Sequence, residues 1–179
     1  MTLAAAAGLA AACSADHHSI AALERALGTN PSATRALESW CAARGLAQDP
    51  QIVARRLKGE AGPEREDLRA RLGVGGDAPL GYRHVELVCG QRVLSEAHNW
   101  YRRDLLSAEM NAALDTSDTP FGKVVGPLDF TRETLDSRHG GEPGCPAGTV
   151  LSQIALLRLP DGRPLALVTE CYTRAAIEP

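Results

Sequence analysis

Aromatic residues make up only 4% of this 179-residue chain, and basic residues do not outnumber acidic ones. With 19 Lys and Arg against 22 Asp and Glu, the formal net charge is −3. The chain therefore lacks the positive surface that a phosphate backbone requires, and it lacks the aromatic platforms on which single-stranded bases stack. We expect no nucleic-acid partner.

Long apolar runs and ligand-type spacings are also missing. No stretch of about 18 or more apolar residues occurs, so the sequence predicts no membrane-spanning helix. None of the five cysteines has C-x-x-C spacing, and the five histidines show no H-x-x-x-H pattern. We therefore expect no metal and no cofactor, and we expect His98 to be an ordinary sheet histidine.

The N-terminal segment resembles the end of a bacterial lipoprotein signal. Thr2–Ala12 is almost entirely Ala, Leu and Gly, without a basic residue, and Cys13 follows it. Cys13 is a candidate lipid anchor, and setting it aside leaves four cysteines, enough for up to two disulfides. The alternative is an Ala-rich helix in a cytoplasmic protein; export to the periplasm is slightly favoured. We treat residues 1–18 as a separate segment and residues 19–179 as the folded domain.

The composition and patterning predict one globular α+β domain, which we expect to be a monomer. Hydrophobic residues are 44% and charged residues 23% of the chain, which suits a buried core. Spacing and capping residues predict helices at Ser19–Leu27, Ser32–Arg44, Pro63–Leu72 and Ser107–Leu114. Strands are expected at Gln51–Leu57, Gly81–Cys89, Arg92–Tyr101, Lys123–Leu135, Val150–Leu159 and Leu165–Tyr172, with a hairpin turn at Gly90-Gln91, a turn at residues 119–122 and a loop at Arg138–Gly148.

Two charged residues interrupt strands that should be buried. Glu170 lies within the apolar Leu165–Tyr172 strand, and Arg83 shares a face with Val85 and Leu87. A buried charge must be paired or hydrogen-bonded. The pattern suggests that Arg83 and Glu170 face each other, either as a plain ion pair between two strands or as the two ends of a site for a small carboxylate.

The order of several motifs resembles the chorismate pyruvate-lyase family between about Ser32 and Tyr172. These motifs are RHVELVC, RVLSEAHNWY, TPFG, LDFTR and LLRLPDGRPLALVTE. The resemblance implies one six-stranded antiparallel sheet with helices on one side. It also implies elimination of pyruvate from chorismate to leave 4-hydroxybenzoate, without metal or cofactor.

The resemblance assigns roles to individual residues. Arg83 would bind a substrate carboxylate, Glu170 would contact the hydroxyl end, and Phe121 would line the pocket. Ala33 stands where the family has Met, and Ala97 stands where it has Arg. The substrate-binding set is therefore Arg83, Phe121, Glu170 and Ala33, with Glu170 and Arg83 as the catalytic candidates.

Two functions follow from these observations. The first is a lyase acting on chorismate or a related small carboxylate, which the pairing of Arg83 with Glu170 favours. The second is a non-catalytic envelope lipoprotein of the same fold that binds a small aromatic or carboxylic ligand. Export and the replacements at Ala33 and Ala97 favour the second.

Overall fold

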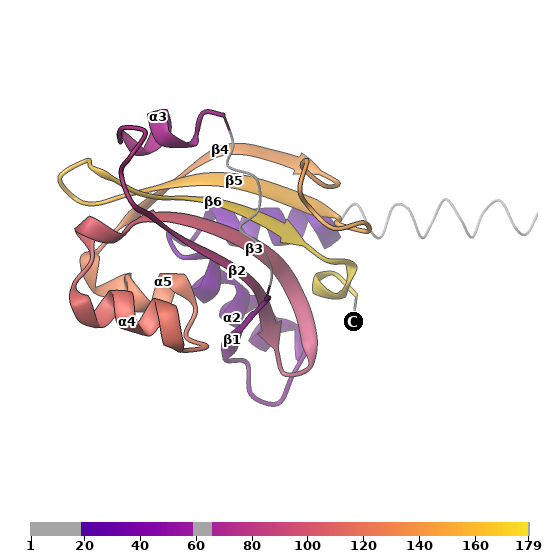
Figure 1. Cartoon of the computed structure of the whole chain (residues 1–179). Coiled ribbons are helices and arrows are strands. Elements are labelled where there is room, and N and C mark those ends of the chain that lie inside the picture. The colour runs from indigo at the N-terminus through magenta and orange to yellow at the C-terminus, as the bar shows by residue number, and fades with distance from the viewer. Residues whose placement is uncertain (1–18, 59–65, 179) are drawn as a thin grey trace, which may run out of the picture.

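The computed structural model describes residues 19–58 and 66–178, in which six strands form one antiparallel sheet (Figure 1). The strand order is β1-β2-β3-β6-β5-β4. The strands are β1 (Ile52–Arg56), β2 (Leu80–Cys89), β3 (Arg92–Arg102), β4 (Thr131–His139), β5 (Leu151–Arg158) and β6 (Pro164–Tyr172). The predicted α+β class with a single antiparallel sheet is confirmed.

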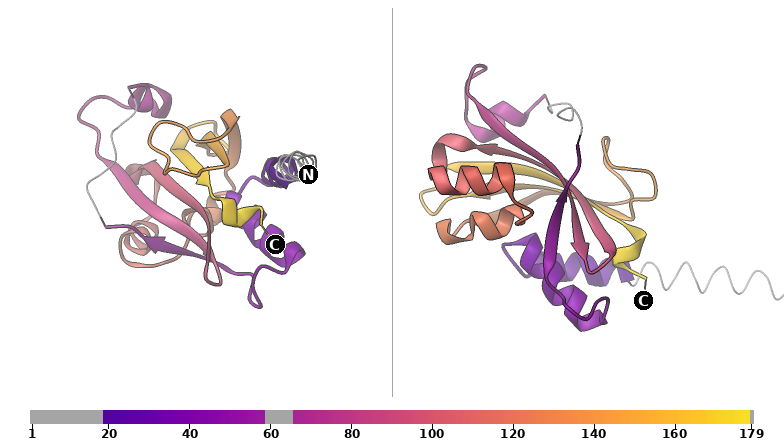
Figure 2. Two further views of the ribbon diagram at one scale, coloured as in Figure 1. Left: turned by 90° about the vertical axis from the view of Figure 1, so that its right-hand side faces the viewer. Right: turned by 60° about the horizontal axis from the view of Figure 1, so that its bottom comes forward.

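Most of the helices cover one face of this sheet, which we call the helix face. Residues 19–28 are helical, and α2 (Ala33–Arg44), α4 (Ala108–Thr116) and α5 (Phe121–Val124) follow in the chain. Figures 1 and 2 show α2, α4 and α5 on the same side of the sheet. Three short 3-10 turns, Arg103–Leu105, Gly126–Leu128 and Arg174–Ala176, complete the described elements.

The opposite face, which we call the α3 face, is covered in part by the short helix α3 (Leu68–Leu72). Leu68 and Leu72 are fully buried there, against a cluster that includes Trp100 and Leu167. Alternate residues of each strand point to opposite faces, so the sheet carries two separate sets of side chains. Within the described residues, no helix is long and apolar enough to cross a membrane.

The β2–β3 hairpin has the two-residue connection that the sequence predicts. Cys89 is paired with Arg92, and Gly90 has a φ of 59°, which suits the first position of a hairpin turn. β1 and β4 form the two edges of the sheet. Arg55 and Arg56 of β1 therefore lie on an edge strand.

The predicted strand Lys123–Leu135 is wrong over most of its length. The chain forms α5 and a 3-10 turn before β4 begins at Thr131. Pro127 stands at the start of the 3-10 turn, where its fixed φ suits a helical conformation. The strand also continues to His139, into the segment expected to be a loop. Of the turn expected at residues 119–122, Phe121 and Gly122 belong instead to α5.

Four of the five cysteines form two disulfides, the number that the sequence allows. Cys41 of α2 is bonded to Cys89 at the end of β2, and Cys145 is bonded to Cys171 of β6. The candidate lipid anchor Cys13 lies outside the described residues, as does the start of the predicted Pro63–Leu72 helix. The first disulfide ties the helix layer to the sheet.

Gly81 of β2 lies in close contact with the Tyr101 ring of β3, and a substitution at Gly81 tests the packing between these two residues. A Cβ at Gly81 would lie 2.3 Å from the Tyr101 ring, which is fully buried. We expect Gly81→Ala to lower the free energy of unfolding by about 1–3 kcal/mol. The matched Gly75→Ala, which meets no heavy atom within 4 Å, should change it by about 0.5 kcal/mol or less. Urea denaturation measures both, and equal midpoints for the two variants would contradict this account.

Candidate functional site

A narrow, partly open cavity lies on the helix face, between the sheet and the first turns of α2 and α5. Its empty volume is about 410 Å³, which includes the open mouth. The apolar wall is formed by Val85, Leu87, Ala97, Phe121, Phe130, Leu157 and Val168. The polar lining residues are Ser32, Thr34, Asn99, Arg132 and Glu170.

A buried ion pair lies in this cavity. Arg132 Nη2 donates to Glu170 Oε2 over 2.7 Å, and the exposed fractions of the two side chains are 5% and 7%. Tyr172 OH donates to the same oxygen over 3.0 Å, while Arg132 Nη2 also donates to Gln153 Oε1 over 3.0 Å. The carboxylate that interrupts the apolar strand is thus neutralised by charge and held by two donors.

The sheet order explains why these groups meet. Glu170 on β6 lies between Ala97 on β3 and Gln153 on β5. Arg132 comes from the edge strand β4, where it is paired with Leu157 of β5. Its long side chain reaches past β5 along the helix face, so the ion pair joins strands that are not neighbours.

The electrostatics keep Arg132 charged and Tyr172 neutral. Burial, the largest single effect, would lower the pKa of Arg132, but the charge of Glu170, the charge of Tyr172 and the hydrogen bond to Glu170 together outweigh it, and the net shift is upward. Burial raises the pKa of the Tyr172 hydroxyl well above its usual value, and the Glu170 carboxylate raises it further. Tyr172 therefore remains a hydrogen-bond donor to Glu170 at any physiological pH.

Both members of the ion pair keep unused hydrogen-bonding atoms. The hydrogen bonds of Arg132 use Nη2, and those of Glu170 use Oε2. Within the described residues, Arg132 Nε and Nη1 and Glu170 Oε1 have no hydrogen-bond partner. The cavity thus offers donors and an acceptor to a ligand.

The first turn of α2 supplies further donors. Ser32 caps the helix, since its Oγ accepts from the Arg35 N–H and its own N–H donates to Asn30 Oδ1. Ala33 and Thr34 line the cavity, and their N–H groups belong to the first turn, where no intrahelical acceptor exists. The charge of Arg132 is balanced by Glu170, so it is the positive end of the α2 dipole that favours an anion in this cavity.

The structure brings three of the four predicted substrate-binding residues together. Ala33, Phe121 and Glu170 all line the cavity, whereas Arg83 does not. Arg83 is buried on the same face, but its Nη1 and Nη2 donate over 2.9 Å to the carbonyls of Thr119 and Ser117. Burial, followed by the charge of Arg56, lowers its pKa.

The predicted Arg83–Glu170 ion pair is therefore wrong, and the partner of Glu170 is Arg132. Arg83 stands opposite Asn99, which stands opposite Val168, so Arg83 is displaced along the sheet from Glu170. Arg132 belongs to the LDFTR motif, and this is the signal that could have identified it. The predicted strand Lys123–Leu135 did contain Arg132, but the sequence did not show that β4 lies next to β5, across which Arg132 reaches Glu170.

No family model matches the chain. It is 38% identical over 169 residues to the uncharacterized protein y4mC of Sinorhizobium fredii (strain NBRC 101917 / NGR234), and the match covers 84% of this chain and 71% of that protein.

Solved structures share the fold. The effector domain of PhnF from Mycobacterium smegmatis superposes with a TM-score of 0.54 at 14% identity, covering 80% of this chain and 89% of that one. The possible transcriptional regulator YydK from Bacillus subtilis subsp. subtilis str. 168 superposes with a TM-score of 0.51 at 14% identity. That match covers 74% of this chain and only 64% of YydK. The shared fold is the chorismate lyase-like fold, as predicted.

Removing one partner of the buried ion pair tests how much the pair contributes to the stability of the fold. We expect Arg132→Met and Glu170→Gln each to lower the free energy of unfolding by about 3–5 kcal/mol, because each leaves a buried group without its partner. The double variant should lose less than the sum of the two. Urea denaturation of all three variants measures this coupling.

The matched control is the exposed pair between Arg158 of β5 and Glu133 of β4, separated by 3.2 Å. Arg158→Met should cost about 1 kcal/mol or less, since water screens an exposed pair. Additive losses at Arg132 and Glu170, no larger than that of the control, would refute the importance of the buried pair.

Proposed function

Since this chain belongs to the family of the uncharacterized protein y4mC of Sinorhizobium fredii, whose name specifies no activity, we propose a function from the cavity itself. The cavity binds a small, planar or aromatic molecule that carries a carboxylate. One observation carries this proposal: the buried Arg132 and the first turn of α2, at Ala33 and Thr34, line the same cavity, whose wall is mostly apolar.

The arrangement of groups favours a ligand that is polar at both ends. A ligand carboxylate accepts hydrogen bonds from the Arg132 nitrogens that Glu170 leaves unused and from the N–H groups in the first turn of α2. Phe121 and Phe130 contact the body of the ligand through apolar surface. Glu170 Oε1 accepts a hydrogen bond from a hydroxyl group, while its other oxygen remains with Arg132 and Tyr172. A hydroxybenzoate has these features.

Filling the cavity tests the binding proposal without disturbing the ion pair. The probe is 4-hydroxybenzoate, measured by isothermal titration calorimetry. Ala97 is buried in the cavity wall next to Glu170, so Ala97→Leu should weaken binding at least about tenfold, or 1.4 kcal/mol. The control Ala112→Leu adds the same side chain at an exposed position of α4 and should bind as wild type does.

Phenol serves as the second ligand in that experiment, because it lacks the carboxylate. It should bind at least about tenfold more weakly than 4-hydroxybenzoate, since a charged hydrogen bond is lost. No binding by wild type, or equal binding by Ala97→Leu, would refute the proposed site.

The second candidate function is a lyase acting on chorismate, favoured by the free Glu170 Oε1 in the cavity and by the motif resemblance. In this reaction the ring carbon that bears the hydroxyl loses a proton, and its electron pair completes the aromatic ring. The neighbouring carbon–oxygen bond breaks, and enolpyruvate leaves and takes up a proton as pyruvate. Arg132 and the start of α2 hold the carboxylate groups, Glu170 accepts the proton, and the apolar wall excludes water.

Arg83 has a positioning role in this proposal. It holds the carbonyls of Ser117 and Thr119, just before α5, and so supports the location of Phe121 in the cavity wall. The small residues Ala33 and Ala97 leave room where the family has larger side chains. The substrate is therefore chorismate or a related carboxylate.

Turnover distinguishes the two candidates. Wild type incubated with chorismate should release 4-hydroxybenzoate and pyruvate in equal amounts, followed by absorbance and by a coupled pyruvate assay. Glu170→Gln should lower kcat by about 100-fold or more, because it removes the base. If wild type binds 4-hydroxybenzoate but forms no product, the lyase candidate is refuted and the binding function stands.

The cysteine pairing favours an exported protein. Disulfides persist in oxidising compartments and are rare in a reducing cytosol, and Cys41, Cys89, Cys145 and Cys171 are all paired. Lipid attachment at Cys13 stays a prediction. An exported location favours ligand binding over lyase activity, because chorismate is a cytoplasmic metabolite.

A further inference from the structure

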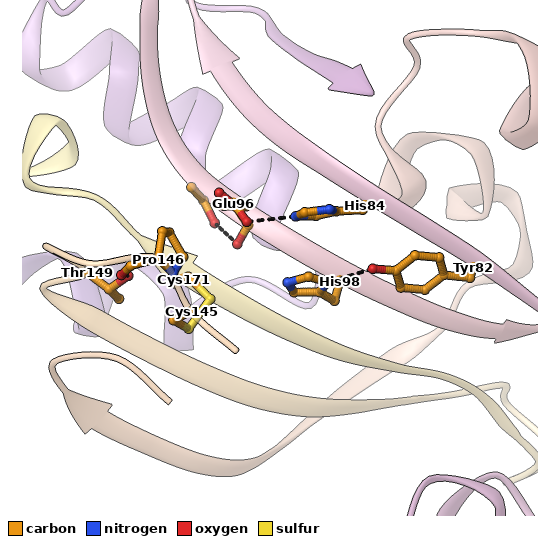
Figure 3. Close-up of a disulfide and its surroundings, with 9 residues drawn as sticks. Tyr82, His84, Glu96, His98, Cys145, Pro146, Thr149 and Cys171 are labelled. Carbon is orange, nitrogen blue, oxygen red and sulfur yellow. Dashed lines mark hydrogen bonds and ion pairs between the residues drawn. A yellow bond between two sulfur atoms is a disulfide. The ribbon is translucent and has the colours of Figure 1, made fainter. Parts of the chain in front are cut away.

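Three side chains with metal-ligating atoms gather on the α3 face of the β2–β3 hairpin, on the other side of the sheet from the cavity. His84 of β2 is directly opposite His98 of β3, and Glu96 lies two residues before His98. Figure 3 shows the three side chains together on the hairpin, beside the Cys145–Cys171 disulfide. Each of them offers a ligand atom that lies within 4.8 Å of the other two.

The imidazole rings and the carboxylate are already in contact. The His84 and His98 rings are stacked, with centroids 4.2 Å apart and planes 17° from parallel. His84 Nε2 lies 2.7 Å from Glu96 Oε1. The side chains of His84 and Glu96 are 23% and 19% exposed, so the cluster lies close to the surface.

His98 has one nitrogen held and one nitrogen unused. Its Nδ1 is 2.8 Å from Tyr82 OH, whereas its Nε2 is buried and has no hydrogen-bond partner among the described residues. Burial, followed by the neighbouring His84, lowers the pKa of His98, although Glu96 and the Gly144 backbone act in the opposite direction. The unpartnered Nε2 is the His98 atom that belongs to the three-residue cluster.

We propose that His84, Glu96 and His98 bind a divalent transition-metal ion, for which Zn²⁺ is the best match. Two imidazole nitrogens and one carboxylate oxygen form a common zinc ligand set. With bonds of about 2.0–2.2 Å, the ligand atoms of a tetrahedral site lie about 3.3 Å apart. The widest separation in the cluster thus closes by about 1.5 Å or less through side-chain rotation.

The surrounding residues fit this assignment. Tyr82 OH at His98 Nδ1 orients the ring so that Nε2 faces the ion, the usual role of a group behind a metal ligand. On binding, the proton between His84 Nε2 and Glu96 is released or moves to His84 Nδ1. The ion replaces that proton as the group that joins the two side chains.

The two nearest potential ligands, Glu86 and Cys171, already have other partners. The fourth coordination position of the proposed ion is therefore left to water or an external ligand. Glu86, opposite Glu96, lies 2.6 Å from Arg55 Nε. Cys171, opposite Glu96 on β6, is bonded to Cys145. Its thiolate is therefore not a ligand in the oxidised protein, and the proposed set has three protein ligands.

Zinc titration of the full-length, untagged chain tests the site. The protein is first treated with a chelator, and the titration is run without reductant so that the disulfides stay closed. Wild type should bind Zn²⁺ at this cluster, and Tyr82→Phe should weaken the affinity by about 10–100-fold, as is usual for a group behind a ligand. His84→Ala and His98→Ala should weaken it more, since each removes a ligand.

The N-terminal His17 and His18 could bind Zn²⁺ by themselves, so the double variant His17→Ala/His18→Ala is included. It should retain the site, as should His139→Ala, which alters a histidine of β4. Cobalt(II) gives a second readout: visible absorption bands from nitrogen ligation should appear in wild type and be absent in His98→Ala.

Thermal unfolding without metal verifies that His84→Ala and His98→Ala remain folded. Zn²⁺ should then raise the unfolding midpoint of wild type but not that of either variant. No Zn²⁺ binding by folded wild type would overturn the proposal. Equal binding by His98→Ala, or loss of binding in the His17→Ala/His18→Ala variant alone, would overturn it as well.

Discussion

The buried ion pair between Arg132 and Glu170 is the constraint on which the functional face of this sheet depends. A carboxylate inside a central strand is costly unless it is paired, and no residue of the adjacent strands supplies a cation opposite it. The cation comes from β4, one strand further away, and reaches across β5. The edge strand therefore completes the centre of the cavity.

The elements that were correctly predicted depend on local patterns. Ser32 and Gly45 mark the ends of α2, Ser107 caps α4, and Gly90 closes the hairpin. The segment after Pro120 was misread, because its apolar residues belong to α5 and a 3-10 turn rather than to a strand. Short apolar runs do not distinguish these conformations.

The sequence predicted most of the residues that line the candidate site, but not which of them form the ion pair. Glu170, Phe121 and Ala33 were identified and do line the cavity, whereas the partner of Glu170 was misassigned. Only Arg83 was identified from the sequence as an inward-facing arginine, whereas Arg132 lies on β4, beyond β5 in the strand order, which the alternation of residues does not encode. The histidine cluster escaped notice for a related reason: its members meet through hairpin register, so their linear spacing resembles no helical ligand motif.

The strand order also has a consequence for how the chain folds. β1, β2 and β3 form one antiparallel meander, β4, β5 and β6 form another, and the two halves of the sheet are joined by β3 and β6. Val85 and Ala97 of the first meander and Val168 and Glu170 of the second enclose the same cavity. The β3–β6 pairing closes a long loop of the chain. Closing it costs conformational entropy, and we therefore expect this pairing to form slowly. The cavity therefore cannot exist in any folding intermediate that contains only one meander, and ligand binding reports on the docking of the two.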